Sequence, residues 1–63
     1  MPLITIEGPK INNIENKRLL AKKLTEAAAE IYSMDKKHIV VVIKENPPEN
    51  VATAGELICD IKK

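Results

Sequence analysis

The second residue of this chain, Pro2, has the most distinctive chemical potential in the sequence. An initiator methionine that precedes proline is generally removed, and removal of Met1 would expose the Pro2 nitrogen as a free secondary amine. Terminal amines titrate near about 7.7–8, and desolvation or nearby cations lower the pKa of such a group. A neutral amine accepts a proton at pH 7, so we predict that Pro2 is a general base. With Met1 retained, the same nitrogen is an amide and cannot act as a base.

The other reactive side chains match no common catalytic or metal-binding pattern. The sequence contains one serine, one histidine and one cysteine, which are Ser33, His38 and Cys59. They form no plausible Ser-His-Asp set, a single histidine and cysteine make a poor zinc site, and a glycine-rich phosphate loop is missing. We therefore predict a protein without a metal or a cofactor. His38 is interpreted as a surface or interface residue at the start of a strand, and Cys59 as a packed side chain.

The length of the chain predicts self-association. Its 63 residues suffice for one domain, which we expect to span residues 1–63. A core of this size barely offsets the conformational entropy that is lost on folding, so small domains usually need disulfides, metals or oligomerisation. Because one cysteine cannot form a disulfide within the chain, we expect an obligate homo-oligomer.

The composition argues against two classes of partner. The net charge is +1 and Tyr32 is the only aromatic residue, so the chain lacks both the basic face and the stacking residues of nucleic-acid-binding proteins. No apolar run approaches the roughly 18 residues that span a membrane. A lone cysteine is typical of a reducing compartment. We expect a cytoplasmic protein that contacts neither nucleic acid nor membrane.

The first half of the sequence predicts a strand followed by a long helix. Residues 2–7 alternate and are rich in β-branched side chains, which predicts a strand. Asn12 followed three residues later by Glu15 resembles a capping box, so a helix should begin near Asn13. No glycine or proline interrupts the range from Ile14 to Ser33, over which the helix should extend. Its expected apolar face, at helical spacing, consists of Leu20, Leu24, Ala27, Ala28 and Ile31.

The second half predicts an α/β fold that assembles through its sheet. Residues 39–43 form a continuous β-branched run, typical of a parallel strand that is buried on both faces. Strand, helix and strand then make a right-handed β-α-β unit. Its single helix covers one face, so partner subunits should cover the other. A proline-rich turn at 45–50 and the apolar residues 57–61 predict a short C-terminal hairpin and a terminal strand that pairs with a neighbour, before a solubilising tail at 62–63.

The order of these features resembles the 4-oxalocrotonate tautomerase family. The resemblance is closest to the small DmpI-type members, and it rests on the Met-Pro opening, the strand, the helix, the second strand and a tail with Glu45, Pro48, Glu49, Asn50, Val51 and Gly55 in the expected order. It implies β-α-β subunits that form dimers and then hexamers. It also implies a cofactor-independent isomerase that moves a proton between carbon and oxygen of enol or dienol 2-oxo acids.

The resemblance assigns roles to three residues. Pro2 matches the catalytic base of the family by position and identity. Lys10 lies in the region of the family's loop arginine, and its ammonium would bind a substrate carboxylate as a point charge. Val51 occupies the position of an aromatic residue in the tail, where it would line an apolar pocket. The family's second-strand arginine falls on Val40, so the substrate clamp differs from the family pattern.

The sequence leaves more than one function open. The first is a tautomerase that acts on an enol or 2-oxo acid through Pro2. The second is a non-catalytic small-molecule-binding or assembly module on the same fold, which the missing arginine and aromatic residue favour. A third is a covalent role for Pro2, as an iminium with aldehydes or ketones.

Overall fold

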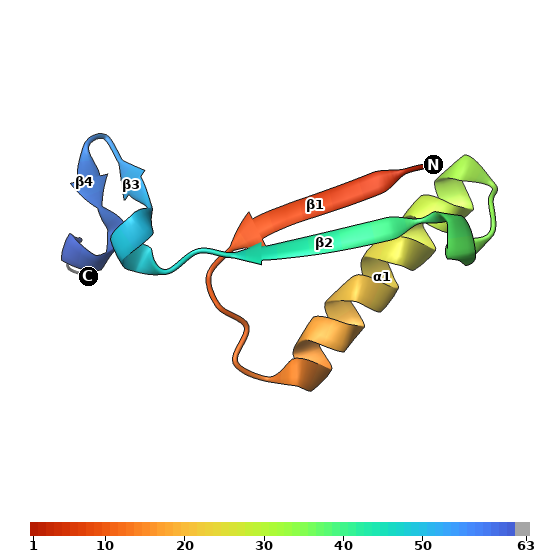
Figure 1. Ribbon diagram of the computed structural model, residues 1–63, viewed down its shortest axis with the longest axis horizontal. Coiled ribbons are helices and arrows are strands. Elements are labelled where there is room, and N and C mark those ends of the chain that lie inside the picture. Colours follow the sequence, from red (N-terminus) through yellow and green to blue (C-terminus); the bar gives the residue numbers. More distant parts are fainter. Residues whose placement is uncertain (62–63) are drawn as a thin grey trace.

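The structure is a computed structural model, and it describes residues 1–61. A two-stranded parallel sheet is covered on one face by a single helix, and a small hairpin lies beyond one end of the sheet (Figure 1). The predicted β-α-β architecture with a short C-terminal hairpin is therefore confirmed. The lysine tail expected at residues 62–63 lies outside the described residues.

The two long strands run parallel with an unbroken register. Strand β1 spans Leu3–Gly8 and β2 spans Val40–Glu45, and Leu3 is opposite Val40 while Gly8 is opposite Glu45. Each strand thus begins and ends slightly later than the sequence pattern predicted. At one end the Val40 N–H donates to the Pro2 carbonyl at 3.1 Å, and at the other the Asn46 N–H donates to the Gly8 carbonyl at 2.8 Å.

Burial in the sheet alternates from residue to residue. Ile4, Ile6, Val41 and Ile43 are half-buried on one face, whereas the side chains on the opposite face are exposed. The expectation that β2 is buried on both faces does not hold within one chain, because Val40 is 42% exposed. The run is β-branched throughout, but this chain has only one helix to lay against the sheet among residues 1–61.

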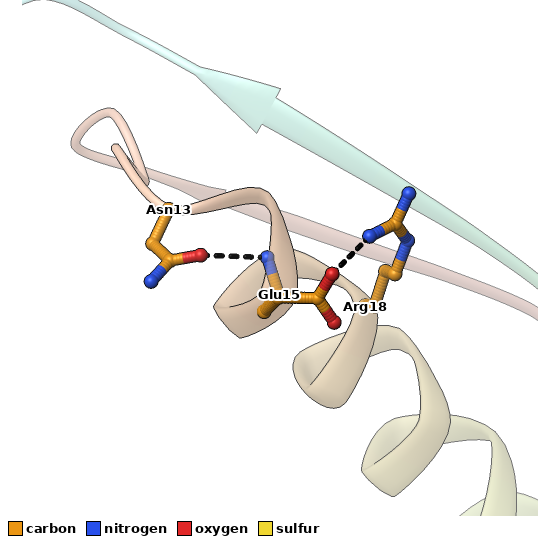
Figure 2. Close-up of polar contacts among 3 residues, drawn as sticks. All are labelled: Asn13, Glu15 and Arg18. Atoms are coloured by element: carbon orange, nitrogen blue, oxygen red, sulfur yellow. Dashed lines mark hydrogen bonds and ion pairs between the residues drawn. The ribbon is translucent and has the colours of Figure 1, made fainter.

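Helix α1 spans Ile14–Tyr32 and begins at a different cap from the one predicted. Its N-cap is Asn13, whose side-chain oxygen accepts the Glu15 N–H at 2.8 Å, as Figure 2 shows. The Glu15 carboxylate does not reach back, as a capping box requires, but forms an ion pair with Arg18 one turn later (Figure 2). Asn12 as the cap is therefore wrong by one residue, because Asn13 has the extended backbone of an N-cap.

The buried face of α1 is rotated relative to the predicted one. The half-buried helix residues are Lys17, Leu20, Ala21, Leu24, Thr25, Ala28 and Ala29. Ala27 is exposed, and Ile31 is 81% exposed in the last turn. The half-buried face thus includes Ala21 and Ala29 in place of Ala27 and Ile31. The helix ends at Ser33, which adopts the left-handed conformation (φ 54°) typical of a C-cap.

The C-terminal segment forms a hairpin between two short 3₁₀ turns. Strands β3 (Ala52–Thr53) and β4 (Glu56–Leu57) pair antiparallel, and the first turn covers Pro48–Asn50. Ala54 and Gly55 connect them with φ of 53° and 82°, the signature of a two-residue type I′ turn. The terminal strand expected at 57–61 is wrong, because Ile58–Asp60 form the second 3₁₀ turn.

The isolated chain is extended and poorly buried. Its extents are 43 × 25 × 16 Å and its radius of gyration is 15.0 Å, whereas a compact domain of this length has a radius of about 11 Å. The accessible surface of 5205 Å² likewise exceeds the roughly 4,000 Å² expected of a compact monomer. Ile39 is the one buried apolar side chain among residues 1–61. The described part of the chain contains no helix that is both long and apolar enough to cross a membrane.

Candidate active site

Pro2 is held at the amino-terminal end of the sheet. It precedes β1, is half-buried, and is fixed through its carbonyl, which accepts the Val40 N–H. Met1 extends from it and is 92% exposed. With Met1 attached, the Pro2 nitrogen is part of a peptide bond.

The other two predicted site residues lie at the opposite end of the sheet. Lys10 is exposed in the loop between β1 and α1, and Val51 follows the first 3₁₀ turn. A cavity of about 390 Å³ opens at this end, and Val51 forms part of its wall. The cavity is lined by Glu7, Gly8, Pro9, Asn46, Pro48, Val51 and Ile58. Its wall is mostly apolar, with the polar groups of Glu7 and Asn46 at the strand ends, and the loop that lines it continues into Lys10.

A single chain does not bring the three predicted residues together. Pro2 and Pro9 are separated by the full length of β1, which is about 20 Å at the usual rise of an extended strand. Figure 1 shows the same separation, with the amino terminus at one end of the sheet and the C-terminal hairpin at the other. One copy therefore carries Pro2 at one end, and Lys10 and Val51 at the other.

The carboxylate of Glu45, for which no role was predicted, connects the end of β2 to the loop after β1 and to α1 near the cavity. One oxygen, Oε2, accepts the Ile11 N–H at 2.9 Å and also contacts the Lys17 ammonium at 3.0 Å. The Ile11 hydrogen bond lowers the pKa of Glu45 most, Lys17 lowers it further, and Lys10 adds a weaker electrostatic contribution. No local pattern could have identified these partners, since Ile11 is 34 residues away in the sequence.

A second side-chain contact joins the ends of β1 and β2 beside the cavity. The side-chain amide of Asn46 donates to Glu7 Oε1 at 3.0 Å, while its backbone N–H continues the ladder to Gly8. Both side chains line the cavity. The cavity end is thus fixed by side chains as well as by the sheet, which is the condition for a preformed binding site.

The remaining reactive side chains lie apart from one another in the described residues. Within residues 1–61, no three histidine, cysteine, aspartate or glutamate side chains gather where they could hold an ion. Cys59 is exposed in the second 3₁₀ turn, so the expected packing of this side chain is wrong for the isolated chain. Val40, at the position of the family's strand arginine, faces the uncovered side of the sheet.

Comparison with known proteins identifies the family. The model of the Tautomerase family, described as tautomerase enzyme, matches residues 2–61. The chain belongs to the tautomerase family. It is 34% identical over 62 residues to the 2-hydroxymuconate tautomerase of Bacillus subtilis, which covers 98% of this chain and 100% of that protein. This tautomerase is therefore an enzyme, an isomerase of the 4-oxalocrotonate tautomerase type.

Solved structures agree with this assignment. The crystal structure of DmpI from Archaeoglobus fulgidus matches with a TM-score of 0.85 and 44% identity, over 94% of this tautomerase and 100% of that chain. A heterohexamer 4-oxalocrotonate tautomerase from Chloroflexus aurantiacus matches with a TM-score of 0.88 and 26% identity, over 98% and 100% of the two chains. The second of these relatives is a six-chain assembly.

Proposed function

We propose that this tautomerase moves a proton between oxygen and carbon of an enol or dienol 2-oxo acid, with Pro2 as the general base after removal of Met1. The observation that carries the proposal is the position of Pro2. It is the first residue matched by the family model, and its carbonyl is tied to β2 so that the ring is held on a rigid strand. The 2-hydroxymuconate tautomerase among its relatives supports a substrate of this class.

The proposed reaction needs no oxidant, reductant or cofactor. The neutral Pro2 nitrogen takes the proton of the substrate hydroxyl, and the electron pair of that O–H bond forms the carbonyl. The carbon–carbon double bond shifts along the conjugated system, and its far carbon takes the proton back from the Pro2 ammonium. Atoms and charge balance over the cycle, and backbone N–H groups or water would stabilise the oxygen as negative charge develops on it.

Substrate recognition is proposed to come from Lys10 and Val51 of a neighbouring copy. The ammonium of Lys10 would bind the carboxylate, and Val51 would contact the apolar part of the substrate at the cavity wall. A neighbour is needed because about 20 Å of β1 separates Pro2 from these residues in its own chain. Antiparallel packing of two sheets would bring the amino-terminal end of one beside the carboxyl end of the other.

We further propose a homo-oligomer, a hexamer built from dimers, in which each single-domain copy covers its open sheet face with a neighbour. The exposed Leu3, Val40 and Val42 and the extended shape of the chain support this arrangement, as does the heterohexamer among the relatives. A cytoplasmic location is proposed with it, on the basis of the single cysteine.

The proposal is tested by the ketonisation of 2-hydroxymuconate and phenylenolpyruvate with wild-type protein and Pro2→Ala. Alanine leaves a primary terminal amine that can still accept a proton, so we expect kcat/KM to fall in Pro2→Ala by up to the roughly 10²–10⁴ that complete loss of a general base costs. Pro47→Ala is the matched control, since it makes the same change in the C-terminal turn outside the cavity lining. Equal rates for wild type and Pro2→Ala would remove Pro2 from the mechanism.

A further inference from the structure

We infer that Glu45 is a positioning residue, which holds the loop that carries Lys10 in the geometry needed to bind the substrate carboxylate. The inference rests on the proposed role of Lys10 and goes beyond it, because Glu45 is assigned no contact with the substrate. Its carboxylate lies at the end of β2 and accepts the Ile11 N–H, one residue after Lys10.

The loop between β1 and α1 has few hydrogen bonds to the rest of the described chain. Between Pro9 and Asn12, the Ile11 N–H bond to Glu45 is the one hydrogen bond to another part of the chain within residues 1–61. Pro9 has no N–H to donate, and the helix cap at Asn13 is satisfied locally by Glu15. Without the Glu45 carboxylate the loop would have hydrogen bonds only at its two ends, where β1 finishes and α1 begins.

The same carboxylate forms an ion pair with one nearby lysine, Lys17, and not with the other, Lys10. Glu45 Oε2 pairs with Lys17 at 3.0 Å, with both side chains about one-third exposed or less (32% and 27%). Lys10 forms no ion pair among the described residues, so its ammonium stays available for an anion. One oxygen therefore joins the sheet, the loop and the first turn of α1, and it neutralises Lys17 while leaving Lys10 to the substrate.

A double-mutant cycle on ketonisation of 2-hydroxymuconate tests the inference. Glu45→Ala in the wild-type background should raise KM roughly tenfold, the effect of losing a charge-assisted hydrogen bond, while kcat stays within about twofold. Lys10→Ala should raise KM by a similar factor. In the Lys10→Ala background, adding Glu45→Ala should leave KM unchanged within about twofold, because the loop no longer carries a binding group.

Two further variants keep the test independent of folding. Glu45→Gln keeps an oxygen that can accept the Ile11 N–H, so its KM should lie between those of wild type and Glu45→Ala. Glu26→Gln is the matched control, since it breaks the exposed ion pair with Lys36 far from this loop and should leave KM unchanged. Exchange of the Ile11 amide with deuterium should be faster in Glu45→Ala than in either wild type or Glu26→Gln.

The outcomes distinguish this inference from the proposed function. Multiplicative effects of Lys10→Ala and Glu45→Ala on KM would overturn the positioning role, and so would a change in kcat with KM unaltered. In either case, an impaired Pro2→Ala would still support Pro2 as the base. Unchanged KM in Lys10→Ala would overturn both the positioning role and the binding role of Lys10. Full activity of Pro2→Ala would overturn the proposed function on its own, whatever Glu45 does.

Discussion

The two ends of the parallel sheet are built in different ways. At the amino-terminal end, Pro2 is held by one backbone hydrogen bond to Val40 and is followed outward by an exposed Met1. At the carboxyl end, Glu45 and Asn46 tie the strands to the preceding loop and helix, and a cavity opens beside them. One end carries the group proposed to react, and the other carries the groups proposed to recognise the substrate. About 20 Å of β1 separates the two sets of groups within one chain, which is why we propose that two copies share one site.

Blocking the Pro2 nitrogen at the amino-terminal end should cause the greatest loss of activity. Protein that retains Met1, prepared in cells deficient in methionine aminopeptidase, keeps the Pro2 nitrogen as an amide, which accepts no proton. We expect kcat/KM for 2-hydroxymuconate to be lower than that of processed protein by roughly 10²–10⁴. Intact mass identifies the two forms, and sedimentation should give them the same assembly. Equal activity of the two forms would exclude the free ring nitrogen as the base.

The second prediction concerns the proposed interface between copies at the open face of the sheet. Val42 lies on the open face of β2, 37% exposed, so Val42→Glu would place a charge in the proposed interface. Loss of one buried valine costs about 1.5–3 kcal/mol per copy, and a buried charge costs more. We expect dissociation in analytical ultracentrifugation together with loss of activity.

The matched control for that experiment is Ile31→Glu. It makes the same kind of change on α1, where the side chain is 81% exposed and outside the half-buried face. Assembly and activity should remain. If Val42→Glu stays assembled and active, the open sheet face is not the interface.

The third prediction concerns the helix that follows the Lys10 loop. Asn13→Ala removes the cap that accepts the Glu15 N–H, and such a loss costs about 1 kcal/mol. For a domain of this size the melting temperature should fall by about 4–8 °C. Asn12→Ala should have little effect, and calorimetry of the two variants separates these caps. A larger loss in Asn12→Ala would favour the capping box over the observed cap.

A further prediction, with a modest effect, concerns the contribution of Glu45 to the pH dependence of the free energy of unfolding. Its folded-state pKa lies below the ordinary value of 4.5, chiefly because of the Ile11 N–H, with Lys17 and Lys10 adding to the shift. A lowered pKa means that the ionised carboxylate stabilises the fold above about pH 4.5, and that this contribution is lost as the pH falls through the folded-state value. Denaturant unfolding of wild type and Glu45→Gln should therefore differ at pH 7 and converge once the pH falls below the folded-state pKa of Glu45. A gap that stays constant with pH would contradict the shift.

Local patterns predicted the elements of the fold well. The alternation of β1, the glycine-free helix and the β-branched β2 each depend on neighbours in the sequence, and their order specifies the β-α-β unit. The errors have local physical causes. Asn12 and Asn13 are both suitable N-cap residues, and the helix uses Asn13. The apolar run at 57–61 was predicted to be a strand, but Ile58–Asp60 form a 3₁₀ turn.

The site was less accessible to prediction from the sequence. Pro2 stands out by its position in the chain, and Lys10 and Val51 came from resemblance to a family rather than from their own chemistry. Glu45 counted only as one of the tail residues in the family order, and nothing in the sequence indicated its contacts, because they join residues that only the folded sheet brings together. The separation of Pro2 from the cavity likewise follows from strand direction, which the identities of these residues do not encode.

The hairpin beyond the sheet exposes apolar side chains that bear on whether the chain can fold alone. Val51, Leu57 and Ile58 remain 38–40% exposed there, and Figure 1 shows the hairpin projecting beyond the sheet. If other copies supply those neighbours, folding and association are a single thermodynamic event. The melting temperature should then rise with total protein concentration, and strong dilution alone should unfold the enzyme.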